Sequence, residues 1–326
     1  MRLLVTIPHY CRRTPNGPGF YGSEKGDIAT RRAQVEQCIL TLHQTFGPRQ
    51  ALLTHTVPVQ ANRDFATVID VVLVTAGDDH LADDLPREFF IQVATDAEPR
   101  LLGFKCHELM RDNAERYDYF AYLEDDIEIV DPMFFDKLGW FSEVFGQSAL
   151  LQPNRFERAP DLHIMKLYVD GNTTSPDLPG RFQDISVRPR LVGGAFGRRY
   201  EFQRVNNVHS GCFFLNATQL NRVAASPMFG QPNADFFGPL ESAATLMIMR
   251  AFEVYKPARE NAAFLEIHHL GRRFLMGHPG APDPVPEAAQ PEPPAPETPA
   301  PETPGPETPA PEIPVPEPVS EASPAP

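Results

Sequence analysis

The sequence has no apolar run long enough to cross a bilayer and no signal-peptide pattern at its N-terminus. The first apolar stretch, residues 2–7, is short and is followed at once by Pro8 and His9. Cysteines are few and far apart, form no C-x-x-C pair and lie mostly in apolar runs: Cys11, Cys38, Cys106 and Cys212. We therefore expect buried thiols in a soluble, cytoplasmic protein, without a disulfide framework, a structural zinc site or an integral membrane segment.

Residues 281–326 lack lysine, arginine and every aromatic residue, yet hold 18 of the 36 prolines and nine acidic residues. Glutamates recur there every five residues in a P-x-P-E-T pattern. Such a segment cannot bury enough apolar surface to offset the entropy of ordering it. The sequence predicts one folded domain over residues 1–280 and a disordered Pro/Glu/Thr-rich tail over residues 281–326. The tail would act as a spacer, a solubilising segment or a docking strip for a protein partner.

The net charge of −14 owes much to this tail. Without its nine carboxylates, 34 acidic residues face 29 basic ones. A domain with this balance is not expected to bind nucleic acid through phosphate contacts.

Apolar runs alternate with helical periodicities in the first half of the chain, which is typical of an α/β sheet with helices on both faces. Strands are expected at residues 2–7, 68–74 and 119–123, and helices at residues 29–46 and 100–115. In the second half we expect strands at residues 149–152, 211–215 and 263–268 and a helix at residues 239–252. Residues 161–207 are left without assigned elements.

Polar residues follow three of the expected strands, at the edge of the sheet where ligands gather in open α/β folds. They are Pro8, His9 and Tyr10 after the first strand, Gly77, Asp78 and Asp79 after the second, and Glu124, Asp125 and Asp126 after the third. Three consecutive acids directly after an apolar strand repel one another and favour a bound cation, although a solvated acidic turn would give the same pattern. Hard ions such as Mg²⁺ and Mn²⁺ take carboxylate oxygens together with water and substrate phosphates.

At this triplet the chain resembles the GT-A class of glycosyltransferases, whose D-x-D motif ends a central strand and holds a metal on the donor diphosphate. The resemblance covers the order of elements from residue 1 to about residue 274 and uses a Glu-Asp-Asp variant of the motif. It implies a GT-A-like Rossmann-type sheet and a metal-dependent transfer from a nucleotide-sugar to a carbohydrate or other hydroxyl acceptor. It also implies Mn²⁺ or Mg²⁺ as cofactor, with Asp126 as the direct metal ligand. Asp125 would support Asp126 or contact the sugar, and Glu124 would lie near the ribose or assist the metal.

The same resemblance implies further nucleotide contacts around the triplet. Thr6 and Pro8 match the turn whose backbone touches the base, and Tyr10 follows in the same segment. A base or ribose contact is expected from Asp78 or Asp79, and Lys105 occupies the helix before the triplet. Each also has an ordinary explanation: a strand end, a turn or a solvated lysine.

A late histidine is a further metal ligand in many members of the class, and His268 and His269 follow an expected strand. Adjacent strand residues face opposite ways, so at most one of the two imidazoles can enter the site. Arg272 and Arg273, close behind, would neutralise the leaving diphosphate.

An inverting transfer needs a base, and the class implies an acid in the region of Asp235 and Glu241. Glu241 is preferred because Pro239 places it at a rigid helix entrance, whereas phenylalanines follow Asp235. An acid in a first helical turn is also explained by the helix dipole alone.

Two alternatives remain open. A sugar-phosphate nucleotidyltransferase shares this architecture but carries a glycine-rich loop directly after the first strand, where this chain has Pro8, His9 and Tyr10. The same difference disfavours dinucleotide-dependent dehydrogenases and P-loop enzymes. A non-catalytic protein that binds Ca²⁺ or a nucleotide through the same acids would share the motif, and the sequence excludes it poorly.

Overall fold

The computed structural model describes residues 1–12, 27–158, 164–171 and 177–277, and the predicted tail lies outside these residues. A five-stranded sheet forms the centre, in the order β13 (Cys212–Asn216), β6 (Tyr119–Leu123), β1 (Arg2–His9), β4 (Val68–Ala76) and β5 (Ile91–Thr95). Strands β6, β1, β4 and β5 are parallel, and β13 pairs antiparallel with β6. The predicted α/β fold class is confirmed.

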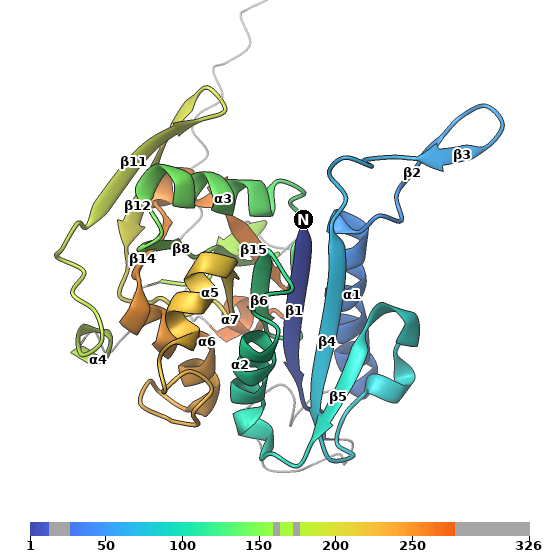
Figure 1. Cartoon of the computed structure of the whole chain (residues 1–326), viewed down its shortest axis with the longest axis horizontal. Coiled ribbons are helices and arrows are strands. Elements are labelled where there is room, and N and C mark those ends of the chain that lie inside the picture. Colours follow the sequence, from blue (N-terminus) through green and yellow to red (C-terminus); the bar gives the residue numbers. More distant parts are fainter. Residues whose placement is uncertain (13–26, 159–163, 172–176, 278–326) are drawn as a thin grey trace, which may run out of the picture. The chain divides into compact units, whose positions relative to one another are not determined.

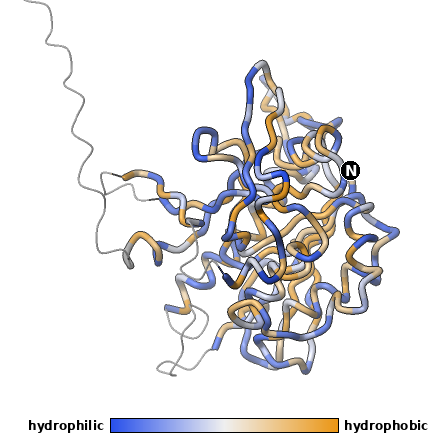
Figure 2. Tube along the Cα trace, turned by 90° about the vertical axis from the view of Figure 1, so that its left-hand side faces the viewer, coloured by the Kyte–Doolittle hydropathy of each residue, from blue (hydrophilic) through white to orange (hydrophobic). Residues whose placement is uncertain are grey.

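Helices cover both faces of this sheet, because β1 is apolar on both sides. Leu3, Val5 and Ile7 pack in one core with α1 (Ile28–Phe46), while Leu4 packs in a second core with α2 (Leu102–Asp112). Figure 1 shows α1 behind the sheet and α2 in front of it. Figure 2 shows apolar stretches along the inner strands and hydrophilic residues along outer loops.

The further helices are α3 (Phe134–Phe145), α4 (Asp177–Gly180), α5 (Ala217–Ala224), α6 (Pro239–Ala251) and α7 (Arg273–Gly277). Short 3₁₀ turns are η1 (Ala82–Asp84), η2 (Arg87–Phe89), η3 (Pro99–Leu101) and η4 (Arg259–Phe264). Buried residues of α3 join the α1 core, and those of α5 and α6 join the α2 core.

Two smaller mixed sheets flank the centre. One has the order β10 (Lys166–Tyr168), β9 (Asn154–Arg158), β15 (Glu266–His269) and β7 (Ile127–Glu128). The other has the order β11 (Arg190–Ala195), β12 (Arg198–Arg204), β14 (Glu253–Pro257) and β8 (Ala149–Leu151). A separate hairpin joins β2 (Ala51–Leu53) to β3 (Pro58–Gln60). Because β15 pairs with β7, directly after the acidic triplet, the late histidines lie beside that triplet.

Most expected elements are found within a few residues, and two expectations need correction. The strand expected at residues 263–268 begins at Glu266, because Asn261 bonds both backbone groups of Glu201 and folds the preceding segment into η4. Residues 161–207, left unassigned, contain β10, α4, β11 and β12.

All four cysteines lie in the described residues, are buried, and form no disulfide, as expected. Within those residues, no helix is both long and apolar enough to span a bilayer.

Candidate functional site

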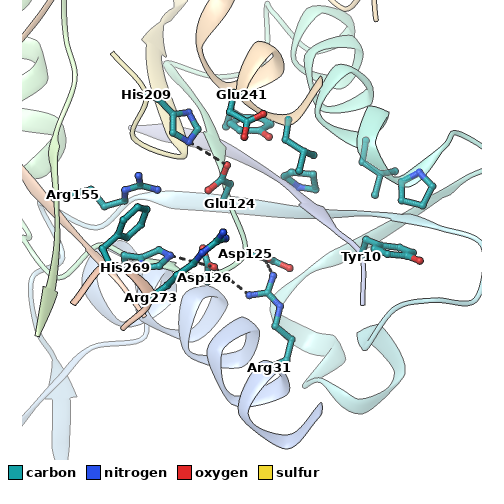
Figure 3. Close-up of a pocket in the computed structure, with 16 residues that line it drawn as sticks. Tyr10, Arg31, Glu124, Asp125, Asp126, Arg155, His209, Glu241, His269 and Arg273 are labelled. Carbon is teal, nitrogen blue, oxygen red and sulfur yellow. Dashed lines mark hydrogen bonds and ion pairs between the residues drawn. The ribbon is translucent and has the colours of Figure 1, made fainter. Parts of the chain in front are cut away.

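A cavity of about 420 Å³ opens beyond the carboxyl ends of β1 and β6 (Figure 3). It collects side chains from the whole length of the domain, including acids, guanidinium groups and imidazoles. Its lining consists of Pro8, Tyr10, Arg31, Pro99, Leu102, Tyr122, Glu124, Asp125, Asp126, Arg155, His209, Leu240, Glu241, His269, Arg273 and Phe274. All three members of the acidic triplet therefore face one cavity.

The triplet is fixed by a backbone bond to the antiparallel edge strand. The amide of Glu124 donates to the carbonyl of Gly211 at 2.8 Å, just before β13 begins. Gly211 has φ +65°, and any Cβ at this position would collide with the Glu124 carboxylate. Glycine is favoured at 211 because other residues rarely adopt this backbone conformation, and a Cβ would also force the Glu124 carboxylate to move.

Asp125 is fully engaged by protein groups. One carboxylate oxygen accepts from Nδ1 of His9 at 2.6 Å, and the other is paired with Arg31. The amide of Leu81 donates to Nε2 of His9 at 3.0 Å, so the imidazole proton sits on Nδ1. Burial alone would raise the pKa of Asp125, but Arg31 and His9 hold it below the ordinary value. This carboxylate ties β1, α1 and the end of β6 together.

Asp126 has capacity left for a ligand. Its Oδ2 lies 3.3 Å from Nη1 of Arg31 and 3.6 Å from Nε2 of His269. Its Oδ1 is buried and has no hydrogen-bond partner in the described part of the chain. A buried carboxylate oxygen without a partner is costly, and it is a natural ligand for a hard cation.

His269 is held with Nε2 facing Asp126. Its Nδ1 bonds Glu157 at 2.8 Å, and Glu157 is completely buried. Glu157 also accepts the amides of Leu275 at 2.9 Å and Phe274 at 3.3 Å, which ties α7 to the histidine. A carboxylate behind an imidazole is the usual support of a metal-binding histidine. Burial lowers the pKa of His269, but Glu157 and Asp126 raise it overall, so a metal at Nε2 would replace a proton.

These residues fit a divalent ion that takes most of its ligands from elsewhere. Among the residues that the structure describes, no three His, Cys, Asp or Glu side chains converge on one point. Asp126 and His269 would supply the protein ligands, and Mg²⁺ or Mn²⁺ commonly completes its shell with water and phosphate oxygens. An imidazole suits Mn²⁺ better than Mg²⁺.

Glu124 has an unusual environment for a carboxylate. Burial, with repulsion from Asp126, raises its pKa to about 7. Its Oε1 lies 3.9 Å from Nε2 of His209, whose pKa is lowered to about 3 by burial and by Arg155. Glu124 therefore shares the cavity with a neutral histidine and is itself partly protonated near neutral pH.

A buried ionic network holds Arg155 beside the triplet. Asp170 pairs with Arg155 at 3.1 Å and with Lys256 at 2.9 Å, and all three side chains are at most 8% exposed. Asp170 also accepts from the hydroxyl of Ser210 at 3.3 Å, and Lys256 donates to the carbonyl of His209 at 3.2 Å. The network thus fixes both Arg155 and the backbone of the His209 segment.

Of the two acids considered as base, only Glu241 lines the cavity. Its Oε2 is buried and finds no hydrogen-bond partner among the described residues. Asp235 is half exposed, pairs with Arg250 at 3.2 Å and is not part of the lining.

Of the remaining residues predicted to contact the nucleotide or metal, some line the cavity and others do not. Pro8 and Tyr10 line the cavity, and the Tyr10 hydroxyl lies 3.4 Å from Asp79, which does not line it. Thr6, Asp78, Lys105 and His268 lie outside the lining. The Thr6 hydroxyl donates to the carbonyl of Ala121 inside the sheet, and Lys105 pairs with Glu108 at 2.9 Å. His268 bonds Glu128 at 2.8 Å and stacks on Phe156.

Three residues of the lining, Arg31, Arg155 and His209, were not predicted from the sequence. Arg31 had a usable signal, since it lies one turn inside the helix that follows the first site segment. His9 stands inside the noted Pro8–Tyr10 segment. Arg155 and His209 come from segments whose positions depend on long-range pairing, and nothing local marks them.

No protein-family model matches the chain, and no curated protein matches its sequence. Among solved structures, it is similar to the crystal structure of GalNAc-T7 with UDP, GalNAc and Mn²⁺, with a TM-score of 0.45, 11% identity and coverage of 89% of this chain and 46% of that one. It is also similar to S. aureus TarS 1-349 in complex with UDP-GlcNAc, with a TM-score of 0.39, 9% identity and coverage of 82% and 58%. The chain spans about half the length of these two structures.

The central sheet, with helices on both faces and the acidic triplet at the end of β6, has the α/β architecture that the sequence predicted.

Proposed function

We propose that this chain is a metal-dependent glycosyltransferase that moves a sugar from a nucleotide-sugar to an acceptor hydroxyl. One observation carries the proposal. Asp126 presents a buried, unpartnered carboxylate oxygen in the same cavity as His269 and three guanidinium groups, Arg31, Arg155 and Arg273. Ligands for a hard cation and several positive charges together suit a metal-bound diphosphate.

Asp126 and His269 would hold Mn²⁺ or Mg²⁺, which when bound offsets negative charge on the leaving diphosphate. The guanidinium groups of the three arginines would offset the same negative charge on the diphosphate. Asp170 holds the guanidinium of Arg155 in the buried network. A preorganised cation of this kind stabilises developing charge without reorganising during the reaction.

Tyr10 and Pro8, at the end of β1, support a nucleoside site at the opposite side of the cavity from β15. Tyr10 offers an aromatic face for a base, and its hydroxyl lies near Asp79. Apolar walls come from Pro99, Leu102 and Tyr122. An aromatic face with apolar walls and few polar groups is typical of a nucleoside pocket.

Glu241 is the proposed general base of an inverting transfer. It would take the proton of the acceptor hydroxyl as the hydroxyl oxygen bonds to the anomeric carbon. The bond from that carbon to the diphosphate breaks, and its electron pair stays on the diphosphate. The unpartnered Oε2 of Glu241 supports this role, since an acceptor hydroxyl would supply its missing partner. Glu124, whose pKa is raised to about 7 by burial, also lines the cavity and is the other candidate for the base.

The test uses Glu241→Gln and Asp235→Asn, two acids of one segment of which only the first lines the cavity. UDP, GDP, CDP and dTDP are first screened with Mn²⁺ by thermal shift, since a ligand of the folded state raises its stability. Release of the matching diphosphate from its sugar donor is then measured with candidate acceptors.

We expect Glu241→Gln to slow turnover by about 10²- to 10⁴-fold with unchanged donor affinity. Asp235→Asn should be close to wild type. Near-normal turnover in Glu241→Gln would show that Glu241 is not the general base, and Glu124 would be tested next. Binding without any release by the wild type would favour the non-catalytic alternative.

A further inference from the structure

The acidic pair Asp125 and Asp126 already has a cation, the guanidinium of Arg31. Arg31 extends from the first turns of α1 and pairs with both carboxylates (Figure 3). Its side chain is 12% exposed. Burial works against its charge, but Asp125 and Asp126 raise its pKa overall. In the form described here, Arg31 does part of the neutralising work that a metal ion would do.

The two ends of this guanidinium are held differently. Nη2 is anchored on Asp125, whose other oxygen is locked by His9. Nη1 lies 3.3 Å from Asp126 and 3.4 Å from the side-chain oxygen of Gln34, both long contacts. Nε is buried and has no partner among the residues that the structure describes. One end is therefore fixed, while the other has weak partners and unused donor capacity.

The weak end contacts the carboxylate that suits a metal. Asp126 is the more exposed member of the pair, with 24% of its side chain accessible against 7% for Asp125. A divalent ion at Asp126 would lie next to the positive charge of Arg31, and the two cations would repel. A diphosphate would attract both, because guanidinium groups bind phosphate oxygens with two parallel N–H donors.

We propose that Arg31 guards Asp126 against a free metal ion and transfers its Nη1 contact to the diphosphate when donor and metal bind together. This inference rests on the proposed function for the identity of the diphosphate, but the predicted effect of Arg31 on the binding of a metal ion alone does not depend on that function. It gives Arg31 effects of opposite sign on two ligands. Arg31 weakens binding of the metal alone and strengthens binding of the metal with a nucleoside diphosphate.

The first measurement is the binding of Mn²⁺ alone, followed by the loss of the electron paramagnetic resonance signal of the free ion. Arg31→Met should bind Mn²⁺ at least about tenfold more tightly than wild type, because a positive charge within a few Å of the ion is gone. Arg32→Met is the matched control, since Arg32 is half exposed on the same helix and, among the described residues, pairs only with Glu36, at 3.9 Å. It should bind Mn²⁺ as wild type does.

The second measurement is calorimetric titration of each nucleoside diphosphate at saturating Mn²⁺. Here Arg31→Met should bind at least about tenfold more weakly than wild type, through loss of a charge-assisted contact. A purely structural role for Arg31 would weaken both kinds of binding. Unchanged or weaker Mn²⁺ binding by a folded Arg31→Met protein overturns the proposal.

Removal of Arg31 leaves the buried carboxylate of Asp125 without its cationic partner, so the folding of each variant is checked by circular dichroism. If Arg31→Met does not fold, Arg31→Lys takes its place, since one ammonium cannot bridge two carboxylates as the guanidinium fork does. Its Mn²⁺ affinity should then exceed that of wild type. Failure of wild type to bind any nucleotide would refute the proposed function and leave the Mn²⁺ comparison intact.

Discussion

The buried network around Asp170 makes a quantitative prediction about stability. Asp170 is 2% exposed and is the only acid paired with Lys256 and Arg155 among the described residues. Asp170→Asn keeps the shape of the side chain but leaves two buried cations without a counter-charge. Breaking a buried ion pair from one side costs about 3–5 kcal/mol. At roughly 2–4 °C per kcal/mol for large domains, the melting temperature should fall by roughly 6–20 °C.

The pH dependence of this loss has a definite sign. Burial raises the pKa of Asp170, but Lys256 and Arg155 bring it below the ordinary value. A carboxylate with a lower pKa in the folded state stabilises the fold above its unfolded pKa, about 4, and loses this effect as the pH falls. The difference in unfolding free energy between wild type and Asp170→Asn should therefore be largest near neutral pH and shrink below about pH 4.

Urea unfolding followed by circular dichroism measures both quantities. Asp112→Asn serves as the control, because Asp112 is 67% exposed and, in the part of the chain that the structure describes, pairs only with Arg111, at 3.6 Å. It should unfold as wild type does. The double variant Asp170→Asn/Lys256→Met should recover part of the lost unfolding free energy, because one of the two unpaired buried cations has been removed. A loss below about 1 kcal/mol in Asp170→Asn would show that the network is not closed as described.

Other predictions concern the support of the site and the tail. Glu157→Gln should lower the affinity for Mn²⁺ with bound nucleotide by roughly 10- to 100-fold, since Glu157 orients His269; equal affinity in a titration would contradict that role. Gly211→Ala should destabilise the protein by at least about 1–2 kcal/mol in urea unfolding, through its left-handed backbone and the contact with Glu124. Truncation after Gly280 should leave the melting temperature nearly unchanged, and a drop of many degrees would show that the tail packs on the domain.

Three strands of the central sheet and two of its helices could be predicted because each is marked by the pattern of apolar residues within its own segment. Apolar runs gave β1, β4 and β6, and helical spacing gave α1 and α2. The acidic triplet was predictable for the same reason, since a charged run after a strand is visible in sequence. Once the strands were known to be parallel, the edge at which the site lies followed from topology.

The rest of the site depends on pairing between distant segments. Arg155 and His209 reach the cavity through β9, β13 and the buried network, and no periodicity marks their faces. The choice between His268 and His269 needed the register of β15 on β7, in which only His269 turns toward Asp126. The pairing of Arg31 with both aspartates was equally hidden, because helix spacing fixes a face and leaves open which strand end it meets.

The central claim is that Asp126 binds a metal that carries a nucleoside diphosphate. Its most direct test is calorimetric titration of UDP, GDP, CDP and dTDP into wild type and Asp126→Asn, each with and without Mn²⁺. We predict that wild type binds one or more of them only with Mn²⁺, and that Asp126→Asn loses this binding while it stays folded. Full Mn²⁺-dependent affinity in Asp126→Asn would contradict the claim.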